Sequence, residues 1–278
     1  MLIHINMEYL KNQTFKWIFV GGGSGVGKTS ISITLSIYFS RFKKNVLLVS
    51  LNPTMCLSDF FQQSFKDHPL YVKGFKTLSA MEFPFITDKT PSYLSIIDNH
   101  LDCLFVNALS DEYDMVIFDT SSTSEIKGLL SMIRDFSKVQ EPKMGLSSLF
   151  EDFSPIKYRE LKMMMLATEK RLKYQTTFIC VSTLRYAALK ETECLLQYLN
   201  EKNINSRFII LNKIIGNNDC AYCRQTLVRQ ASLIRDVDDV YSEYIIIEIP
   251  FCDYILDSVE KCSWFFESFR ERPSHSQV

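Results

Sequence analysis

A glycine-rich loop between an apolar strand and a helix limits what this chain can fold into more than any other stretch does. Residues 15–20 (FKWIFV) are apolar and rich in β-forming side chains, which predicts a buried strand. Residues 21–30 (GGGSGVGKTS) then satisfy the pattern G-x-x-x-x-G-K-[ST]. Over residues 30–39, apolar side chains share one face of a helix. Strand, loop and helix in this order predict a phosphate-binding loop rather than a chance glycine-rich turn.

The residue types in this loop suit the phosphates of a nucleotide. Glycines let backbone N–H groups approach a phosphate without a Cβ in the way, and the start of a helix adds positive potential. Lys28 is expected to reach the β and γ phosphates, and the Thr29 hydroxyl is expected to face Mg²⁺. The sequence therefore predicts a nucleotide phosphate site.

The rest of the chain alternates between short apolar runs and helical patterns. This alternation predicts an α/β fold of the P-loop NTPase type, with a mostly parallel central sheet and helices on both faces. The 278 residues fit one domain spanning 1–278, with 271–278 as a frayed tail. Residues 115–119 (MVIFD) form an expected strand that ends in an acid, as a Walker B element does. The other expected strands are 46–50, 75–83, 177–182, 207–212 and 244–249, and the other expected helices are 57–65, 93–109, 187–199, a helix after Cys220, and 253–269.

Composition excludes some classes of partner. With 31 basic and 32 acidic residues, the net charge of −1 gives no electrostatic support for nucleic-acid binding. No apolar stretch approaches the roughly 18 residues of a membrane span, and residues 1–10 lack the pattern of a signal peptide, so we expect a cytosolic protein. Eight irregularly spaced cysteines are expected to be mostly reduced core residues, apart from the C-x-x-C pair at Cys220 and Cys223.

Several blocks of the chain together carry a family resemblance. They extend from Lys16 to about Phe269 and comprise 17–22 (WIFVGG), 57–59 (LSD), 72–82 (VKGFKTLSAME), 113–120 (YDMVIFDT), 176–181 (TTFICV), 190–193 (KETE) and 220–223 (CAYC). In order and context, the chain is similar to the arsenite-transporter-type (ArsA-like) ATPases, in particular their eukaryotic branch, the cytosolic ATPase that delivers tail-anchored membrane proteins to the endoplasmic reticulum. That resemblance implies a homodimeric, deviant P-loop ATPase that binds ATP near the dimer interface, forms an apolar groove for a transmembrane helix, and meets receptor proteins at the endoplasmic reticulum.

The resemblance also implies roles for individual residues. Asp119 matches the acid that holds the Mg²⁺ shell together with Thr29, and Asn212 matches the asparagine that contacts the adenine edge. From the pattern alone, a cap of a strand end is the better explanation of Asn212. Pro250 and Phe251 fall where the family packs the base. The positions of the phosphate loop are Gly23, Ser24, Gly25, Val26, Gly27, Lys28, Thr29 and Ser30.

Several departures from the family pattern concern catalysis. Gly23 replaces a lysine that reaches the partner's phosphates, and Ser24 replaces the next glycine. Asn52 replaces the Asp that activates the attacking water, and an amide cannot take a proton at neutral pH. Arg185 replaces a glutamate near the nucleotide, and residues 119–126 (DTSSTSEI) have lost the proline, glycine and histidine of the family's second switch. We therefore expect a protein that binds ATP with Mg²⁺ well and hydrolyses it slowly.

The pair Cys220 and Cys223 supplies two thiols, whereas structural zinc is bound by four ligands. Two copies of the pair across a two-fold axis would complete a Cys₄ site, which agrees with the interface zinc that the resemblance implies. A redox or merely structural C-x-x-C pair at a helix start is the alternative.

Residues 131–175 depart from the strand and helix alternation and are rich in methionine. In the family this inserted helical segment forms the groove for clients, and methionine suits a groove that accepts varied apolar partners. On the pattern alone, methionines at helical spacing more often belong to an ordinary core. The groove interpretation places Met164 and Met165 in contact with clients, and also includes Met132, Met144, Leu149 and Leu172.

Three function classes stay open from the sequence. The first is an ATP-dependent targeting factor that captures the transmembrane segments of tail-anchored proteins. The second is a hydrolysis-deficient, nucleotide-binding holdase of the same fold, and Asn52 is the residue that separates it from the first. The third is an arsenite-pump ATPase subunit, although such pumps usually have two fused halves and a triplet of metalloid-binding thiols.

Overall fold

The computed structural model describes residues 15–52, 56–82, 111–138, 155–216, 220–254 and 256–271. Its strands form one nine-stranded sheet within these ranges, in the order β3-β4-β2-β5-β1-β6-β7-β8-β9. All inner strands run parallel, while β3 and β9 at the two edges pair antiparallel. The strands are β1 (Trp17–Gly22), β2 (Val46–Ser50), β3 (Leu70–Tyr71), β4 (Leu78–Glu82), β5 (Met115–Asp119), β6 (Thr176–Thr183), β7 (Phe208–Ile214), β8 (Ile245–Pro250) and β9 (Arg270–Glu271).

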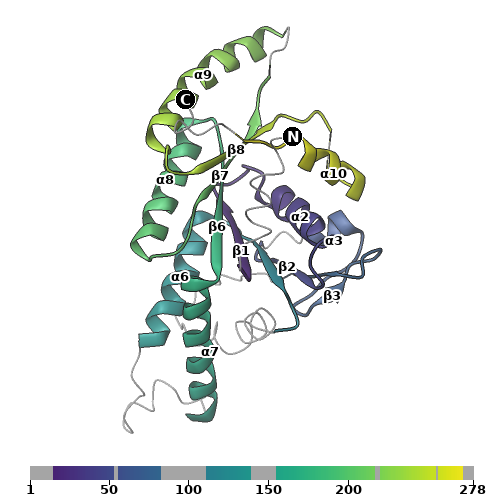
Figure 1. Ribbon diagram of the computed structural model, residues 1–278, viewed down its shortest axis with the longest axis vertical. Coiled ribbons are helices and arrows are strands. Elements are labelled where there is room, and N and C mark those ends of the chain that lie inside the picture. Colours follow the sequence, from purple (N-terminus) through teal and green to yellow (C-terminus); the bar gives the residue numbers. More distant parts are fainter. Residues whose placement is uncertain are drawn as a thin grey trace.

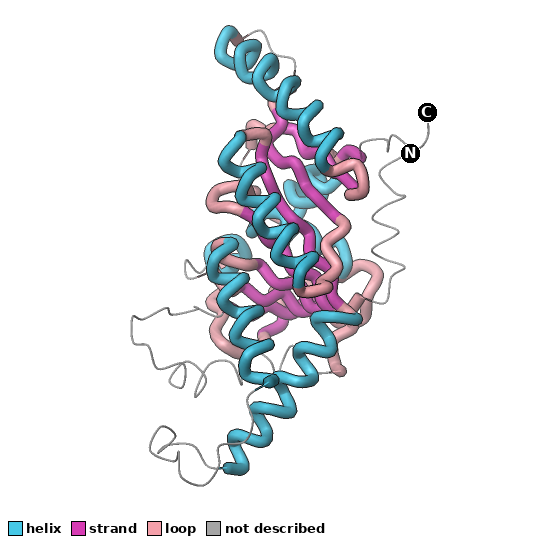
Figure 2. The backbone as a smooth tube through the Cα atoms, turned by 90° about the vertical axis from the view of Figure 1, so that its left-hand side faces the viewer, coloured by secondary structure: helices cyan, strands magenta, loops and turns pink. Residues whose placement is uncertain are grey.

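Helices cover both faces of this sheet, which confirms the predicted α/β fold with a mostly parallel sheet (Figure 1). One face packs against α2 (Lys28–Phe39), α3 (Cys56–Phe61) and α10 (Val259–Glu267). The other packs against α6 (Thr123–Lys138), α7 (Pro155–Tyr174), α8 (Tyr186–Glu201) and α9 (Ala221–Val240), which stand in front of the sheet in Figure 2. Among the described helices, none is both long enough and apolar enough to cross a bilayer.

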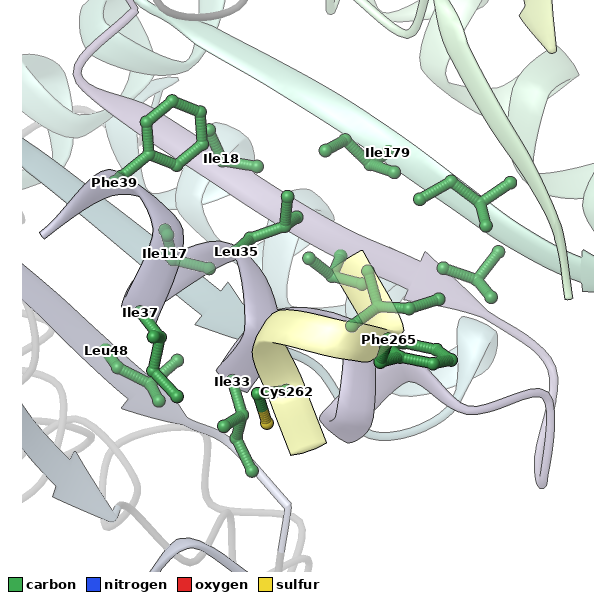
Figure 3. Packing of buried hydrophobic residues seen from close by; sticks show 14 of the residues in the cluster. Ile18, Ile33, Leu35, Ile37, Phe39, Leu48, Ile117, Ile179, Cys262 and Phe265 are labelled. Carbon is green, nitrogen blue, oxygen red and sulfur yellow. The ribbon is translucent and has the colours of Figure 1, made fainter. Parts of the chain in front are cut away.

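The alternation of side chains along each inner strand produces these two apolar layers. In β1, Trp17 and Phe19 face the α6–α9 side, while Ile18 and Val20 face the α2 side. On the first side, the Phe19 ring stacks on Phe118 at a centroid distance of 4.1 Å and on Phe178 at 4.8 Å. On the second side, Figure 3 shows side chains of α2 and α10 packed over those of the strands, with Cys262 beside Ile33. Burial on both faces explains why these strands are continuous apolar runs.

Several element boundaries differ from the sequence-based prediction. Helix α3 ends at Phe61 instead of 65, because Gln62 takes a left-handed conformation with φ 49°. Helix α10 begins only after Ser258, whose hydroxyl accepts a hydrogen bond from Lys261 N. The edge strands β3 and β9 were not predicted, since two-residue strands leave no periodic pattern. The predicted helix at 93–109 and the end of the tail, 272–278, lie outside the described residues.

The order of the strands determines where a ligand site can form. The chain leaves β1 through α2 on one face, and leaves the neighbouring β5 through α6 on the opposite face. The two connections separate at the carboxyl ends of β1 and β5, which opens a crevice between them. The glycine-rich loop and Asp119 both lie at these strand ends.

Candidate nucleotide-binding site

The loop from β1 to α2 has the backbone of a phosphate cradle. Gly27, at the N-cap of α2, has φ 101°, and a Cβ built there would lie 2.3 Å from Asn212 Nδ2. Only glycine fits this position. Because glycine has no side chain to cap the helix, the first N–H groups of α2 stay available to an anion.

Lys28 lies beneath the loop with 8% of its surface exposed, and its Nζ donates a hydrogen bond to Gly23 O at 2.7 Å. Burial lowers the pKa of this ammonium, and the charges of Asp119, Glu191 and Glu125 partly oppose that effect. The lysine therefore lies near carboxylates that favour its charged form, at the place where the phosphates of a nucleotide would arrive.

Asp119 ends β5 and is fully buried. Its Oδ2 accepts a hydrogen bond from Thr29 Oγ1 at 2.8 Å, its Oδ1 lies 3.2 Å from Ser32 Oγ, and Ser50 Oγ lies 3.4 Å from Oδ2. Burial raises the pKa of Asp119 to about 6, although these hydroxyls and Lys28 act in the opposite direction. The structure thus brings together the two predicted Mg²⁺ ligands, Thr29 and Asp119, and these hard oxygen donors suit Mg²⁺.

Asn52 follows β2 at the same edge of the sheet. Its backbone N–H donates to Ser50 Oγ at 3.2 Å, and Ser50 Oγ in turn lies 3.4 Å from Asp119 Oδ2. Ser50 therefore links the backbone of Asn52 to Asp119 in the crevice. Pro53, the next residue of the resemblance, lies outside the described residues.

Glu82 holds the start of α3. This carboxylate is 1% exposed at the end of β4, and it accepts hydrogen bonds from Leu57 N at 2.6 Å, from Ser58 N at 3.2 Å and from the Ser58 hydroxyl. Because these N–H groups belong to the first turn of α3, Glu82 acts as its cap.

Asn212 and its neighbour Lys213 contact the loop from β7. Asn212 is 4% exposed and donates from Nδ2 to Val26 O at 2.8 Å, while its Oδ1 accepts from Lys213 N at 2.9 Å. Lys213 Nζ donates to Gly25 O at 2.8 Å. Asn212 therefore both closes the end of its strand and packs against the loop.

Pro250, Phe251 and Arg185 lie at the same edge of the sheet. Pro250 pairs with Ile214 at the end of β7, and Phe251, which is 59% exposed, donates its N–H to Ile214 O at 2.8 Å. Arg185 precedes α8 and is exposed, and its Nε donates to Thr183 Oγ1 at 3.2 Å rather than to the loop. The exposed Phe251 ring is thus near β7, whereas the guanidinium of Arg185 is held at the end of β6.

Gly23 stands where the resemblance places a lysine. It is buried, and a Cβ built on it would lie 2.5 Å from Glu191 Oε2 of α8. The space of the missing side chain is therefore next to a carboxylate. Ser24 and Gly25, by contrast, are exposed at the tip of the loop.

Cys220 and Cys223 lie at the start of α9, distant in sequence and fold from the loop. Cys220 is the N-cap and is exposed, and Cys223 is half-buried. A hydrogen bond from the backbone N–H of Cys223 lowers the pKa of the Cys220 thiol, with further hydrogen bonds from the Cys223 side chain and the Tyr222 backbone. Within the described ranges, no set of three or more metal-binding side chains occurs. The pair on one chain therefore offers half of a tetrahedral thiolate set.

The expectation that the remaining cysteines belong to the core is only partly right. Cys180 and Cys262 are buried, and burial raises their pKa values to about 12 and about 11. Cys194 is exposed on α8 because its helical position faces solvent, and Cys56 and Cys252 are half-buried at element ends. Cys103 lies outside the described residues.

The methionines of α7 divide between two environments. Met165 is 1% exposed and packs in the same cluster as Leu172, so its assignment to a client groove is wrong; it is a core residue. Met163 and Leu166 are 68% and 41% exposed, and Met164 is partly buried. Met132 of α6 is also partly buried against the core, whereas Met144 and Leu149 lie outside the described residues.

Comparison with known proteins decides the family. A sequence profile of the anion-transporting ATPase family matches residues 15–90 and 84–268, and so spans most of the chain, including the loop, Asp119 and Asn212. The chain belongs to the anion-transporting ATPase family. Members similar to it include "ATPase asna-1" of Caenorhabditis elegans, 27% identical over 307 residues (87% of this chain and 89% of the relative). "ATPase GET3" of Malassezia globosa is 27% identical over 300 residues (91% and 90%), and "ATPase ASNA1 homolog" of Dictyostelium discoideum is 29% identical over 280 residues (87% and 85%).

Membership of the anion-transporting ATPase family, and the names of these relatives, support ATPase activity and the binding of ATP with Mg²⁺. The sequence argument did not assign roles to Glu82, Glu191, Glu125 or Lys213. Glu82 and Glu191 lie within blocks that carry the resemblance, but no spacing rule links Glu82 to the start of α3 or Glu191 to Gly23. Lys213 had one signal, its position next to Asn212 at a strand end.

Proposed function

We propose that this protein is an ATP-dependent targeting factor that captures transmembrane segments of tail-anchored proteins in the cytoplasm and delivers them to the endoplasmic reticulum. The chain would act as one domain, 1–278, into which the helical segment 131–175 is inserted. The observation that carries the proposal is that this segment, which follows the Asp119 strand of a well-formed phosphate site, presents Met163 and Leu166 to solvent on α7. Receptors at the endoplasmic reticulum would be the partners in delivery.

The phosphate site supports the ATP-dependent part of the proposal. The N–H groups of the loop and the start of α2 would hold the phosphates, and Lys28 would turn from Gly23 O to a phosphate oxygen. Thr29 and Asp119 would hold Mg²⁺, which shields the charge of the phosphates when bound. Asn212, Pro250 and Phe251 would contact the base, since an amide both donates and accepts and an exposed ring stacks.

Asn52 and Gly23 support slow hydrolysis within that cycle. Asn52 would orient the attacking water but cannot take its proton, and Glu191 stands beside Gly23 where a cation would assist the γ-phosphate. Turnover would then depend on dimer closure and on water alone to remove the proton.

Exposed apolar side chains on α7 support client capture. A transmembrane helix of about 20 apolar residues must leave water along its whole length, so its carrier needs a continuous apolar surface. Met163 and Leu166 are three residues apart and lie on one face of α7, and methionine adapts to different partner shapes. Helix α7 also extends beyond one end of the sheet (Figure 2), where a second copy could complete a groove.

A capture experiment tests the proposal. A purified peptide of about 20 leucine and alanine residues with a photo-crosslinking side chain at its centre is mixed with the full protein, with and without ATP and Mg²⁺. We expect crosslinks to α7 that depend on nucleotide. A peptide of the same length with lysine at every fourth position is the matched control and should not crosslink. Absence of capture, or crosslinks spread evenly over the surface, would overturn the proposal.

A second candidate is a nucleotide-binding holdase that captures clients without competent hydrolysis. Asn52 favours it, because the one position where the family places a carboxylate next to the water holds an amide. Capture that is equal with ATP, with ADP and without nucleotide, together with no phosphate release, would support this candidate over the first.

A further inference from the structure

The end of β7 is irregular where it meets the phosphate loop. Strand β7 pairs with β8 in a regular register up to Leu211, and the register then shifts before Ile214. Lys213, inside this shift, has a left-handed backbone with φ 62°. A lysine rarely adopts this conformation, and bulges of this kind often redirect a side chain beside a functional site.

The irregularity directs two consecutive side chains to the same loop. In a regular strand, Asn212 and Lys213 would point to opposite faces of the sheet. Here Asn212 Nδ2 donates to Val26 O and Lys213 Nζ donates to Gly25 O, both at 2.8 Å. The bond from Lys213 N to Asn212 Oδ1, at 2.9 Å, fixes which end of the Asn212 amide faces the loop.

These contacts control the direction of the loop's N–H groups. A trans peptide is planar, so the carbonyl of one residue and the N–H of the next point in opposite directions. A fixed Gly25 carbonyl therefore fixes the Val26 N–H, and a fixed Val26 carbonyl fixes the Gly27 N–H. Both N–H groups are then turned away from β7 and belong to the stretch whose backbone donors would contact phosphate.

The contact from Lys213 also adds a charge that the loop lacks. Gly23 provides no cation, and Glu191 Oε2 occupies the space beside it. Lys28 is the buried cation below the loop, whereas Lys213 is exposed and reaches the loop from outside, at Gly25. Its positive charge raises the potential for an anion without the burial that Lys28 undergoes.

We propose that Lys213 is a positioning residue of the nucleotide site: it holds the Gly25–Val26 peptide with its N–H toward the polyphosphate of a nucleoside triphosphate, and it supplies positive charge in place of a lysine at Gly23. The inference rests on the proposed function only in that the site binds a nucleotide. It assigns Lys213 no contact with the reacting atoms.

Binding of ATP and ADP to the full-length protein, measured by isothermal titration calorimetry with Mg²⁺ at low and high salt, tests this role. Lys213→Met should weaken ATP binding about tenfold at low salt, as expected for a hydrogen bond with a charged partner, and its affinity should change less with salt than that of the wild type. Lys213→Arg should restore affinity to within about threefold, since it keeps both the charge and the donor. In turnover assays, KM should rise for Lys213→Met while kcat changes less than about twofold.

Lys202→Met is the matched control. Lys202 is the C-cap of α8, with its Nζ over the Tyr198 ring, at the opposite end of that helix from Glu191. The Lys202→Met variant should bind ATP like the wild type. ATP binding by Lys213→Met that equals the wild type at both salt concentrations would overturn the inference. An equal loss in Lys202→Met, or a lower melting temperature that Lys213→Arg does not restore, would overturn it as well. If the wild type itself bound no nucleotide, the proposed function would fail first.

Discussion

Asn52 and Asp119 place an amide and a buried carboxylate at neighbouring strand ends, and these two side chains limit what the site can do. Asp119 is held by three hydroxyls and is suited to Mg²⁺, so it is not available as a base. Asn52, whose backbone N–H is linked to Asp119 by two hydrogen bonds through Ser50, has an amide side chain that cannot accept a proton from water. We therefore predict that the site binds a triphosphate more effectively than it cleaves it.

Asn52→Asp is expected to raise ATP turnover by about 10²- to 10⁴-fold, the usual contribution of a positioned general base. The affinity for ATP should stay nearly unchanged, because the new carboxylate acts on the water and not on the phosphates. Steady-state phosphate release and calorimetric binding measure the two quantities. Asp67→Asn, at an exposed position before β3, is the control and should leave both unchanged. A wild-type rate equal to that of Asn52→Asp would show that another residue supplies the base.

The raised pKa of Asp119 predicts a pH dependence of stability. Its folded value of about 6 lies above the ordinary 3.8, so the folded state binds this proton more tightly than the unfolded chain does. The contribution to stability is therefore fully present below about pH 4 and is lost as the pH rises through about 6, with a total of about 3 kcal/mol. Without metal, the wild type should lose this stability as the pH rises from about 4 to about 7, whereas Asp119→Asn should not. The free energy of unfolding of Asp119→Asn, relative to that of the wild type, should therefore increase by this amount over the same range.

Urea unfolding at a series of pH values, in buffer with a chelator, measures that difference. Added Mg²⁺ and ATP should reverse it, since only the wild type retains the carboxylate that would hold the metal. A difference between Asp119→Asn and the wild type that does not change with pH would contradict the burial argument.

At the residue scale, the sequence predicted the residues that a local motif contains and missed those that arrive from elsewhere in the fold. Lys28 and Thr29 follow from the loop pattern, and Asp119 from an apolar run that ends in an acid. Glu191 reaches Gly23 from α8, and Lys213 reaches Gly25 across 188 positions of sequence. Such contacts depend on strand order and on a bulge, and neither has a periodic signal.

At the scale of elements, the apolar side chains of α7 divide between the core and solvent, although residues 161–166 (LKMMML) form one methionine-rich run. Helical geometry turns Met165 and Leu172 into the core and Met163 and Leu166 toward solvent. The two interpretations of this segment, core and groove, therefore apply to different residues of one helix. The strands were predicted more accurately than this helix because burial on both faces makes them uniformly apolar, whereas three adjacent methionines give no clear helical face.

The two faces of α7 should respond differently to substitution. Met163→Gln combined with Leu166→Gln should change the free energy of unfolding by less than about 0.5 kcal/mol per site, because both side chains are exposed. The pair should weaken the capture of a transmembrane peptide about tenfold or more, since two apolar contacts are lost. Met165→Ala should instead cost about 2–5 kcal/mol of stability, as for other buried methionines.

Peptide capture by fluorescence anisotropy and urea unfolding, measured on the same variants, separate these effects. Normal capture by the Met163 and Leu166 double variant would remove α7 from the client surface. A large loss of stability in that variant would instead mean that a second copy of the chain covers this face.

At the scale of the whole molecule, the phosphate site and the cysteine pair lie on different elements of one sheet. The loop follows the central strand β1, whereas Cys220 and Cys223 begin α9, which follows β7 and extends from the opposite end of the molecule to α7 (Figure 1). The α/β alternation predicts a mostly parallel sheet, but the order of its strands, and with it the crevice at the ends of β1 and β5, comes from the structure. Assembly could not be predicted either, because an interface pattern is shared between two chains and one chain shows half of it.

The cysteine pair predicts a zinc-bridged homodimer. Two copies of Cys220 and Cys223 across a two-fold axis give the four thiolates of a closed tetrahedral zinc site. Metal analysis of purified protein should therefore find about one zinc per two chains, and light scattering should find a dimer. Cys220→Ser should release the metal and shift the protein to monomer, with a chelator producing the same shift in the wild type. Cys194→Ser, which changes an exposed thiol on α8, is the matched control and should keep both metal and dimer. One zinc per chain would require ligands from outside the pair, and a dimer that persists in Cys220→Ser would mean that apolar contacts rather than metal hold the two copies together.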